Sequence, residues 1–218
     1  MFPEITKQMV DEYAMLSQHK TAEAYKKGRI AKMIVPMTVY TPEGWVVADR
    51  DQQPRPDTTM EGLKDLKTPF RPLGKVTAGN ASGLNDGACG VLLMAADKAR
   101  ELNIQPKMRM VAYTYAGVRP EVMGLGPIPA THKVFKISGL NMDDIDLIEI
   151  NEAFAVQCIA FMKEFGLKLP DEPRLNPWGG AIAFGHPLAS SGPRLMIHLM
   201  HEFADNPSAK YGLATMCV

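Results

Sequence analysis

The chain has 218 residues, of which 46% are hydrophobic and 22% are charged, with 24 basic and 24 acidic side chains. This composition is typical of a globular protein with one medium domain, or one domain and an appendage. The zero formal net charge argues against binding nucleic acid or an anionic membrane through bulk electrostatics.

Three cysteines, Cys89, Cys158 and Cys217, are widely spaced and form no CxxC pair. An odd, scattered set of cysteines indicates reduced intracellular thiols and gives no sign of a structural zinc site. The first residues do not resemble a signal peptide, and no apolar run approaches the roughly 18 residues of a membrane span. We therefore expect a cytoplasmic protein without a membrane span, with an organelle as the remaining alternative.

The N-terminal third differs in composition from the rest of the chain. Residues 6–27 show the apolar periodicity of an amphipathic helix, and Ile30–Val39 is expected to hold a short strand. The proline-rich stretch 41–74 is predicted to be an excursion packed on a core, with a short helix near Met60–Leu66. We place a domain boundary near Gly74.

After this boundary, strand-like and helix-like segments alternate. The predicted strands are Ala88–Ala95, Met108–Tyr115, Ile145–Ile150, Ala181–Phe184 and Tyr211–Met216. Four helices are predicted. The first is capped by Asp97 and runs to Leu102, and the second is Ala130–Ser138. The third runs from about Glu152 to Gly166, and the fourth from Pro193 to about Ala204. Such alternation favours an α/β domain with helices covering a sheet.

Three chemically capable side chains follow candidate strands directly: Asn151, His186 and Cys217. Ligands in α/β sheets collect beyond the carboxyl ends of strands, so this shared placement predicts that the three converge. Each has a plainer interpretation: Asn151 as the N-cap of the next helix, His186 as a satisfied core histidine, and Cys217 as an ordinary buried thiol.

Longer motifs surround these residues. They include Asn151-Glu152-Ala153-Phe154, the segment 176–187 with Gly185-His186-Pro187, and Tyr211–Cys217. Upstream segments with the same likeness are 55–59, 76–88 and 126–130. In order and spacing these motifs resemble those of the thiolases, the acetyl-CoA C-acyltransferases, over nearly the whole chain.

The resemblance implies a fold and an activity. Residues 1–74 would be part of the thiolase loop domain, and residues 75–218 would be the C-terminal core domain, a mixed sheet covered by helices and lacking its last strand. The implied reaction is acyl exchange between a cysteine thiolate and coenzyme A, making or cleaving a carbon–carbon bond in a 3-ketoacyl-CoA, as in fatty acid β-oxidation. Coenzyme A is a substrate here, and no cofactor or metal is expected.

The resemblance also implies roles for individual residues. Asn151 would hold a water that forms an oxyanion hole together with His186, and Cys217 would be the acid/base that moves the α-proton. A thiol suits that role because modest environmental shifts bring its pKa near working pH. The coenzyme A site would be formed by Arg55, Leu66, Phe70, Ala78, Ser82, Leu84, Met123 and Phe154, an apolar slot with few polar anchors.

The family's nucleophilic cysteine has no counterpart among these residues. Cys89 and Cys158 are both interpreted as buried packing residues. We therefore expect the chain alone to be inactive, and to work as a homo-oligomer or with a complementary N-terminal thiolase half. The alternative is a non-catalytic thiolase-fold subunit that binds acyl-CoA or scaffolds a partner. Asn-Glu-Ala-Phe argues against a sterol-carrier thiolase or a ketoacyl synthase.

Two further features lie near the C-terminal helix. Ala189 stands where the family more usually has glycine. His198 and His201 are three residues apart, but no third metal ligand is evident, and Arg194, Glu202 and Asp205 predict a solvated helix face.

Overall fold

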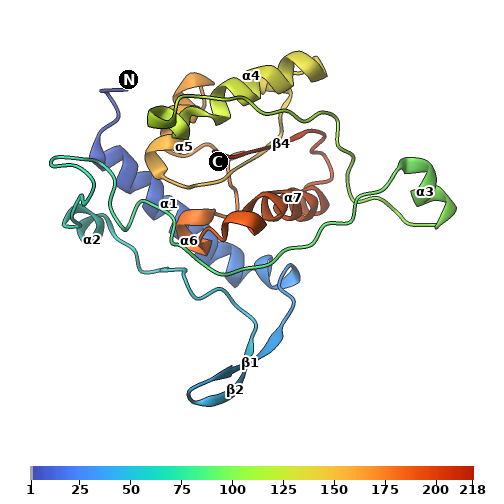
Figure 1. Cartoon of the computed structure of the whole chain (residues 1–218), viewed down its shortest axis with the longest axis horizontal. Helices are drawn as coiled ribbons and strands as arrows, with labels where there is room; N and C mark the ends of the chain where they lie inside the picture. The colour runs from blue at the N-terminus through green and yellow to red at the C-terminus, as the bar shows by residue number, and fades with distance from the viewer. Residues whose placement is uncertain (1) are drawn as a thin grey trace.

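A pair of parallel strands lies at the centre of the computed structural model, which describes residues 2–218 (Figure 1). β3 (Leu147–Ile150) pairs with β4 (Gly212–Thr215), with Leu147 opposite Gly212 and Ile150 opposite Thr215. All four residues of β3 are buried, as is usual for a parallel strand covered on both faces. The predicted strands at 145–150 and 211–216 are confirmed.

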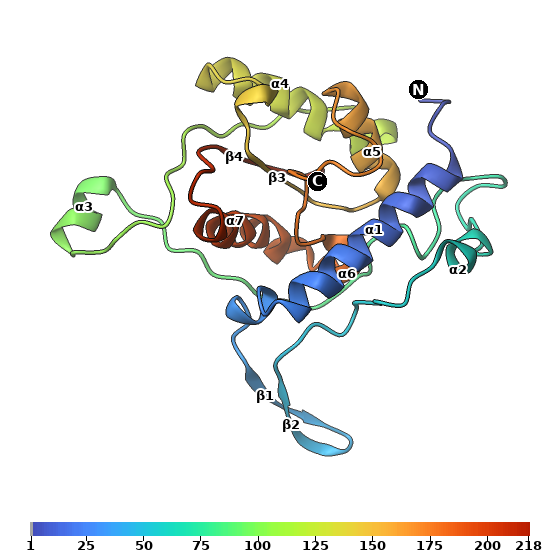
Figure 2. The same cartoon turned by 180° about the vertical axis from the view of Figure 1, so that it is seen from behind.

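Helices cover both faces of this strand pair (Figures 1 and 2). α7 (Leu188–Asp205) packs against both strands, and α4 (Pro127–Ser138) contacts β4 from the other side. α5 (Ala155–Glu164) contacts α4, and α1 (Lys7–Lys26) packs against α5 and against the short helix α6 (Ala181–Phe184). The α/β class is therefore confirmed.

The main core forms where α1, α5 and β3 meet. Its fully buried side chains include Val10 of α1, Ile148 and Ile150 of β3, and Phe161 and Met162 of α5. Burying each such side chain contributes roughly 1.5–3 kcal/mol, so this contact is a main source of stability. The core thus fixes the end of β3, where Asn151 begins the Asn-Glu-Ala-Phe motif.

The other elements are short and lie around this core. They are the 3-10 helices η1 (Ile30–Lys32), η2 (Pro120–Leu125) and η3 (Met142–Asp144), the helices α2 (Met60–Lys64) and α3 (Ala96–Glu101), and the strands β1 (Met37–Thr41) and β2 (Gly44–Ala48). Among residues 2–218, every helix is too short or too polar to cross a bilayer.

β1 and β2 form an antiparallel hairpin that projects away from the core (Figure 1). The turn between them ends at Gly44, whose φ of +114° is unfavourable for other residues. The prediction of one strand within 30–39 is only partly right, because residues 30–32 are helical and the strand starts at Met37. The second strand of the hairpin was not predicted.

Two predicted strands are wrong as regular elements. Residues 88–95 and 108–115 are extended, but within residues 2–218 neither segment pairs with a strand. They are largely exposed, with Leu92 and Tyr113 each 77% accessible. Residues 107–114 face β4 across a cleft of about 550 Å³. An apolar run favours an extended backbone, but a strand also needs a hydrogen-bonding neighbour.

One further strand prediction and two helix predictions also need correction. Residues 181–184 form α6 rather than a strand, because Ser17 Oγ and Glu152 Oε2 accept hydrogen bonds from the N–H groups of Gly180 and Ile182. α7 begins at Leu188 and contains Pro193, since the amides of residues 190 and 191 already bond to the Pro187 carbonyl. α3 is preceded by Ala95, and Asp97 lies inside it.

Candidate active site

Asn151 lies at the carboxyl end of β3, beside the end of β4. Its backbone N–H donates to the Thr215 carbonyl at 3.0 Å, continuing the parallel ladder, and its side chain is fully buried. Cys217 follows two residues after Thr215. Asn151 and Cys217 therefore lie after the same end of the strand pair, as predicted, whereas His186 follows the helix α6 and not a strand.

The N-cap interpretation of Asn151 is wrong. α5 begins only at Ala155, and Phe154 is its N-cap residue. The Asn151 side chain instead points to His186, with Nδ2 3.3 Å from the imidazole Nε2. Within residues 2–218, Asn151 Oδ1 has no hydrogen-bond partner although it is buried. A buried amide oxygen without a hydrogen-bond partner is suited to binding a water or a ligand group.

His186 is held by its own backbone and by the segment 83–85. Gly185 has φ +87°, and a Cβ there would collide with the Asn85 side-chain amide, so this position requires glycine. The His186 N–H donates to the Gly83 carbonyl and to Asn85 Oδ1, both at 3.1 Å. The imidazole is therefore presented by a tightly bonded turn.

The second imidazole nitrogen contacts a serine of α7. His186 Nδ1 lies 2.5 Å from Ser191 Oγ, and that hydroxyl is 3.2 Å from the Pro187 carbonyl. If Nδ1 carries the proton, it donates to Ser191, and Asn151 Nδ2 donates to Nε2. If Nε2 carries the proton, the Ser191 hydroxyl donates to Nδ1, the contact with Asn151 Nδ2 is no longer a hydrogen bond, and Nε2–H can donate to a substrate oxygen. Ser191 therefore supports both tautomers.

Burial keeps His186 neutral. Desolvation lowers its pKa below 6.5, and the positive charge of Arg194 acts in the same direction. A neutral imidazole can exchange one proton between its nitrogens and can donate a hydrogen bond without carrying charge.

Cys217 is buried, and its thiol lies 3.8 Å from Gln157 Oε1 on α5, a weak hydrogen bond. Burial raises the pKa of Cys217 above 9.0. The expectation that surroundings bring this pKa toward neutrality is wrong for the protein without ligand, because desolvation disfavours the thiolate. The thiol is thus the resting form and could donate a proton.

The predicted coenzyme A residues do not all lie together. Arg55, Leu66 and Ala78 line one cavity of about 420 Å³. Met123 lines a separate cavity of about 740 Å³ together with Cys217. Phe70 is 80% accessible and lies outside both cavities.

The remaining three predicted residues connect the first cavity to the catalytic side chains. Ser82 N–H donates to the Ala153 carbonyl at 3.0 Å, and Ala81 forms a bridge with Phe154. Leu84 forms a bridge with His186, and its side chain is exposed. Segment 81–84 therefore runs from the cavity to the imidazole.

The other two cysteines differ from each other. Cys89 is exposed on the unpaired segment 88–95, so its interpretation as buried packing is wrong. Cys158 is buried on α5 as predicted, and burial raises its pKa well above the usual value.

Several residues that shape the site were missed. Ser191, Gln157 and Asn85 each contact one of the three catalytic candidates. Glu152, although part of a recognised motif, was given no role. Its buried carboxylate accepts hydrogen bonds from Tyr13, Ser17, Asn176 and Ile182. The position of Ser191, five residues after His186 at the start of a helix, was the one available signal.

Comparison with known proteins covers the chain in two parts. Residues 3–97 match the family model of the thiolase N-terminal domain, and residues 104–218 match that of the thiolase C-terminal domain.

Individual relatives align with almost all of this chain. It is 45% identical over 98% of its length to the 3-oxoadipyl-CoA/3-oxo-5,6-dehydrosuberyl-CoA thiolase of Escherichia coli K12, and 46% identical over 98% to the acetyl-CoA acetyltransferase of Syntrophomonas wolfei. It covers 53% of each of these proteins, so it spans about half the length of the curated relatives it matches.

Solved structures agree with the sequence matches. The acetyl-CoA acetyltransferase of Bacillus anthracis superposes with a TM-score of 0.93 at 42% identity, covering 99% of this chain and 54% of that one. Human mitochondrial 3-ketoacyl-CoA thiolase in complex with CoA gives a TM-score of 0.91 at 38% identity, with 99% and 52% covered. The chain therefore belongs to the thiolase family.

Proposed function

We propose that this chain supplies half of a thiolase active site, acting on a 3-ketoacyl-CoA and coenzyme A. The observation that carries this proposal is the meeting of Asn151 and His186 at 3.3 Å beside the end of β4, from which Cys217 follows. The likeness to thiolases over 98% of the chain supports the reaction class.

Asn151 and His186 are proposed to stabilise the thioester oxygen as it becomes enolate-like. The unpartnered Asn151 Oδ1 is suited to accept a hydrogen bond from a water, and that water would donate to the substrate oxygen alongside His186 Nε2–H. Removing one donor of this kind typically costs about 2.7–4 kcal/mol in the barrier.

Cys217 is proposed as the acid/base at the substrate α-carbon. In the direction of cleavage its thiol donates a proton to the enolate carbon, and in condensation the thiolate removes that proton. The raised pKa favours the thiol, so protonation of the enolate starts from the resting state.

Coenzyme A is proposed to bind along the cavity of Arg55, Leu66 and Ala78, with its thiol end directed by segment 81–84 toward His186. This mostly apolar cavity, lined also by the charged residues Arg55 and Asp57, suits a thin pantetheine arm, and the Arg55 cation suits its phosphates. The human mitochondrial relative was solved in complex with CoA, which supports this ligand class.

The nucleophilic thiolate is proposed to come from outside these 218 residues. Cys158 is enclosed in the core, and Cys89 lies on a segment without regular pairing. We therefore infer that the chain alone does not turn over, and that acyl transfer requires a complementary thiolase half.

A chimera tests this proposal directly. The corresponding portion of the Escherichia coli relative would be replaced by residues 2–218, and thiolysis of acetoacetyl-CoA would be followed. We expect thiolysis by the chimera, its loss with His186→Ala or Cys217→Ser, and none by the chain alone. A folded chimera whose activity is unaffected by both substitutions would contradict the proposed roles.

The same chimera distinguishes the proposed catalytic function from the non-catalytic alternative. A scaffold or acyl-CoA-binding subunit would bind coenzyme A, measured by calorimetry on the 218-residue chain, but its folded chimera would be inactive. Arg55→Ala should weaken binding by the chain in either case, so thiolysis by the chimera decides between the two functions.

A further inference from the structure

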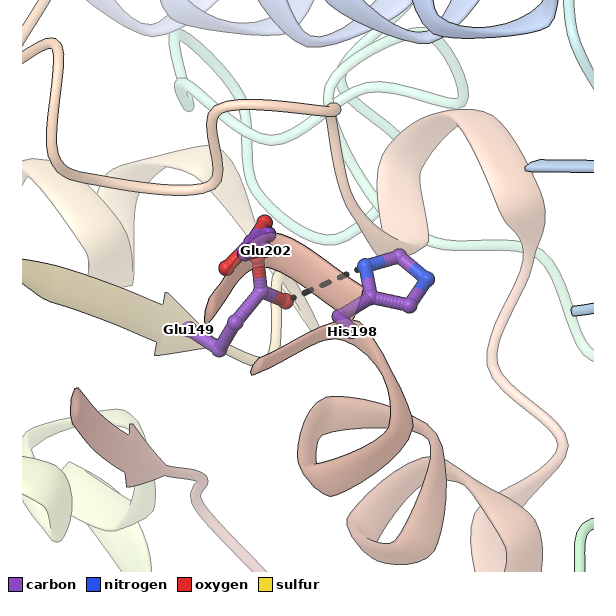
Figure 3. Close-up of side chains that lie close together, drawn as sticks. All are labelled: Glu149, His198 and Glu202. Carbon is purple, nitrogen blue, oxygen red and sulfur yellow. Dashed lines mark ion pairs between the residues drawn. The ribbon is translucent and has the colours of Figure 1, made fainter. Parts of the chain in front are cut away.

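A buried cluster of Glu149, His198 and Glu202 lies between β3 and α7 (Figure 3). Glu149 comes from the strand, and His198 and Glu202 are one helical turn apart on α7. Their exposed fractions are 1%, 3% and 2%. One ligand atom from each residue lies within 4.8 Å of the others, and Glu149 Oε2 is 3.3 Å from His198 Nδ1. The prediction of a solvated face with His198 and Glu202 is wrong.

When both carboxyl groups are ionised, the polar atoms of this cluster do not satisfy one another. With one of them protonated, Glu149 and Glu202 can share a hydrogen bond. Within residues 2–218, Glu149 Oε1, both carboxyl oxygens of Glu202 and His198 Nδ1 have no hydrogen-bond partner. The 3.3 Å contact from His198 Nδ1 to Glu149 Oε2 is an ion-pair distance without hydrogen-bond geometry. Groups buried in this way cost free energy unless a further partner binds them.

Among residues 2–218, no lysine or arginine forms an ion pair with Glu149 or Glu202. Arg194 and Arg29 act on the cluster electrostatically, but Arg194 donates to the Gly185 carbonyl at 2.7 Å and Arg29 pairs with Asp205 at 3.1 Å. Since His198 Nδ1 is buried without a hydrogen-bond partner among residues 2–218, this nitrogen can present a lone pair to an ion. A neutral imidazole is the form that binds metals.

We propose that Glu149, His198 and Glu202 form a binding site for a divalent transition-metal ion such as Zn²⁺. One imidazole nitrogen and two carboxylates are a common zinc donor set, and a water would complete the coordination. Burial raises the pKa of Glu149 to about 8 and that of Glu202 to about 10, so the ion would displace their protons, and its two positive charges would then balance the two carboxylates. His201, the partner considered from the sequence, lies outside the cluster.

A metal here would have a structural consequence. It would fasten α7 to β3, the strand that leads into Asn151, while α7 carries Ser191 and follows His186 directly. The ion would therefore fix the relative positions of Asn151 and His186 without touching the substrate. The inference does not depend on the proposed reaction.

The test uses the 218-residue chain freed of metal with a chelator. Zn²⁺ binding would be measured by isothermal titration calorimetry, and bound zinc would be counted after desalting. We expect one ion per chain, with affinity weakened about tenfold or more in His198→Gln and Glu202→Gln. His201→Gln, on the same helix, is the matched control and should bind as the parent does.

Melting curves in chelator would show whether each variant folds. Glu202→Gln is the preferred variant, because a neutral amide resembles a protonated carboxyl in the metal-free core. Co²⁺ bound to the parent protein gives an independent readout, with d–d bands but no thiolate-to-cobalt charge-transfer band expected. Absence of stoichiometric binding, equal affinity in folded Glu202→Gln, or a thiolate band would each overturn the proposal.

Discussion

Ser191 contacts Nδ1 of His186 and so influences which imidazole nitrogen carries the proton. Its hydroxyl is 2.5 Å from His186 Nδ1 and can either accept or donate the hydrogen bond there. We expect Ser191→Ala in the chimera to lower kcat about tenfold, with little effect on KM, because a hydrogen bond of this kind contributes about 1–1.5 kcal/mol. Steady-state thiolysis kinetics would measure both parameters.

The neighbouring serine provides the control. Ser190 Oγ bonds to the same Pro187 carbonyl at 3.2 Å but makes no bond to the imidazole. Ser190→Ala should leave kcat near that of the parent chimera, and Ser191→Thr should recover part of the loss. An equal effect of the two alanine substitutions would mean that Ser191 acts through helix stability alone.

His186 should titrate at lower pH in the folded chain than in the unfolded chain. Burial penalises the charged imidazolium, and Arg194 adds repulsion, so the folded-state pKa lies below 6.5. As the pH falls, the unfolded chain therefore takes up this proton first. NMR titration of the imidazole C–H signal, assigned with His186→Ala and compared with the urea-unfolded chain, would measure the shift. A folded-state pKa equal to or above the unfolded-state pKa would contradict the burial of His186.

Residue types and predicted strand ends pointed to Asn151, His186 and Cys217, but the strand-end argument holds only for Asn151 and Cys217, because the segment before His186 is the helix α6. Sequence could not identify Gln157 or Asn85, since their roles arise from contacts across 60 and 101 residues. The direction of the Cys217 pKa shift was likewise set by burial, which depends on how α5 and β4 pack.

At the scale of elements, Glu152 joins α1, α6 and the segment after β3. Its buried carboxylate accepts hydrogen bonds from Tyr13 at 3.1 Å, Ser17 at 2.6 Å, Asn176 at 2.9 Å and the Ile182 amide at 3.1 Å. Glu152→Ala would leave these donors unpaired in the core. We expect a loss of about 3–5 kcal/mol in the free energy of unfolding, measured with urea.

Glu43→Ala is a suitable control, because Glu43 is exposed in the hairpin turn. It should change the free energy of unfolding by no more than about 0.5 kcal/mol. A similarly small effect for Glu152→Ala would show that water replaces the carboxylate and that the junction is not a main source of stability.

The same junction explains why α6 was predicted as a strand. Ala181–Phe184 is short and apolar, and its helix depends on a hydroxyl and a carboxylate that are distant in sequence. By contrast, α1, α4 and α5 were predicted well, because their periodicity and their glycine stops are local signals. Gly139 and Gly166, at φ +74° and +63°, are two such stops.

At the scale of the whole molecule, two extended segments do not join the central sheet. Residues 88–95 and 108–115 were predicted as strands from their apolar residues, yet within residues 2–218 they have no strand partner. The edge of β4 facing residues 107–114 is separated from them by the cleft. A strand needs a hydrogen-bonding neighbour that can be distant in sequence, so local sequence could not reveal this opening.

Amide hydrogen exchange should therefore be fast in these two segments and slow in the core. We expect amides of 88–95 and 108–115 to exchange almost without protection in dilute protein, because their opening free energy is near zero. Amides of β3 and α5 should exchange only through global unfolding, at a cost of about 5–15 kcal/mol. Mass spectrometry of peptic peptides would compare these regions, with the exposed hairpin β1–β2, whose strands are paired, as an internal reference of intermediate protection. Protection of 108–115 equal to that of β4 would mean that the segment is paired in solution and that the cleft is closed.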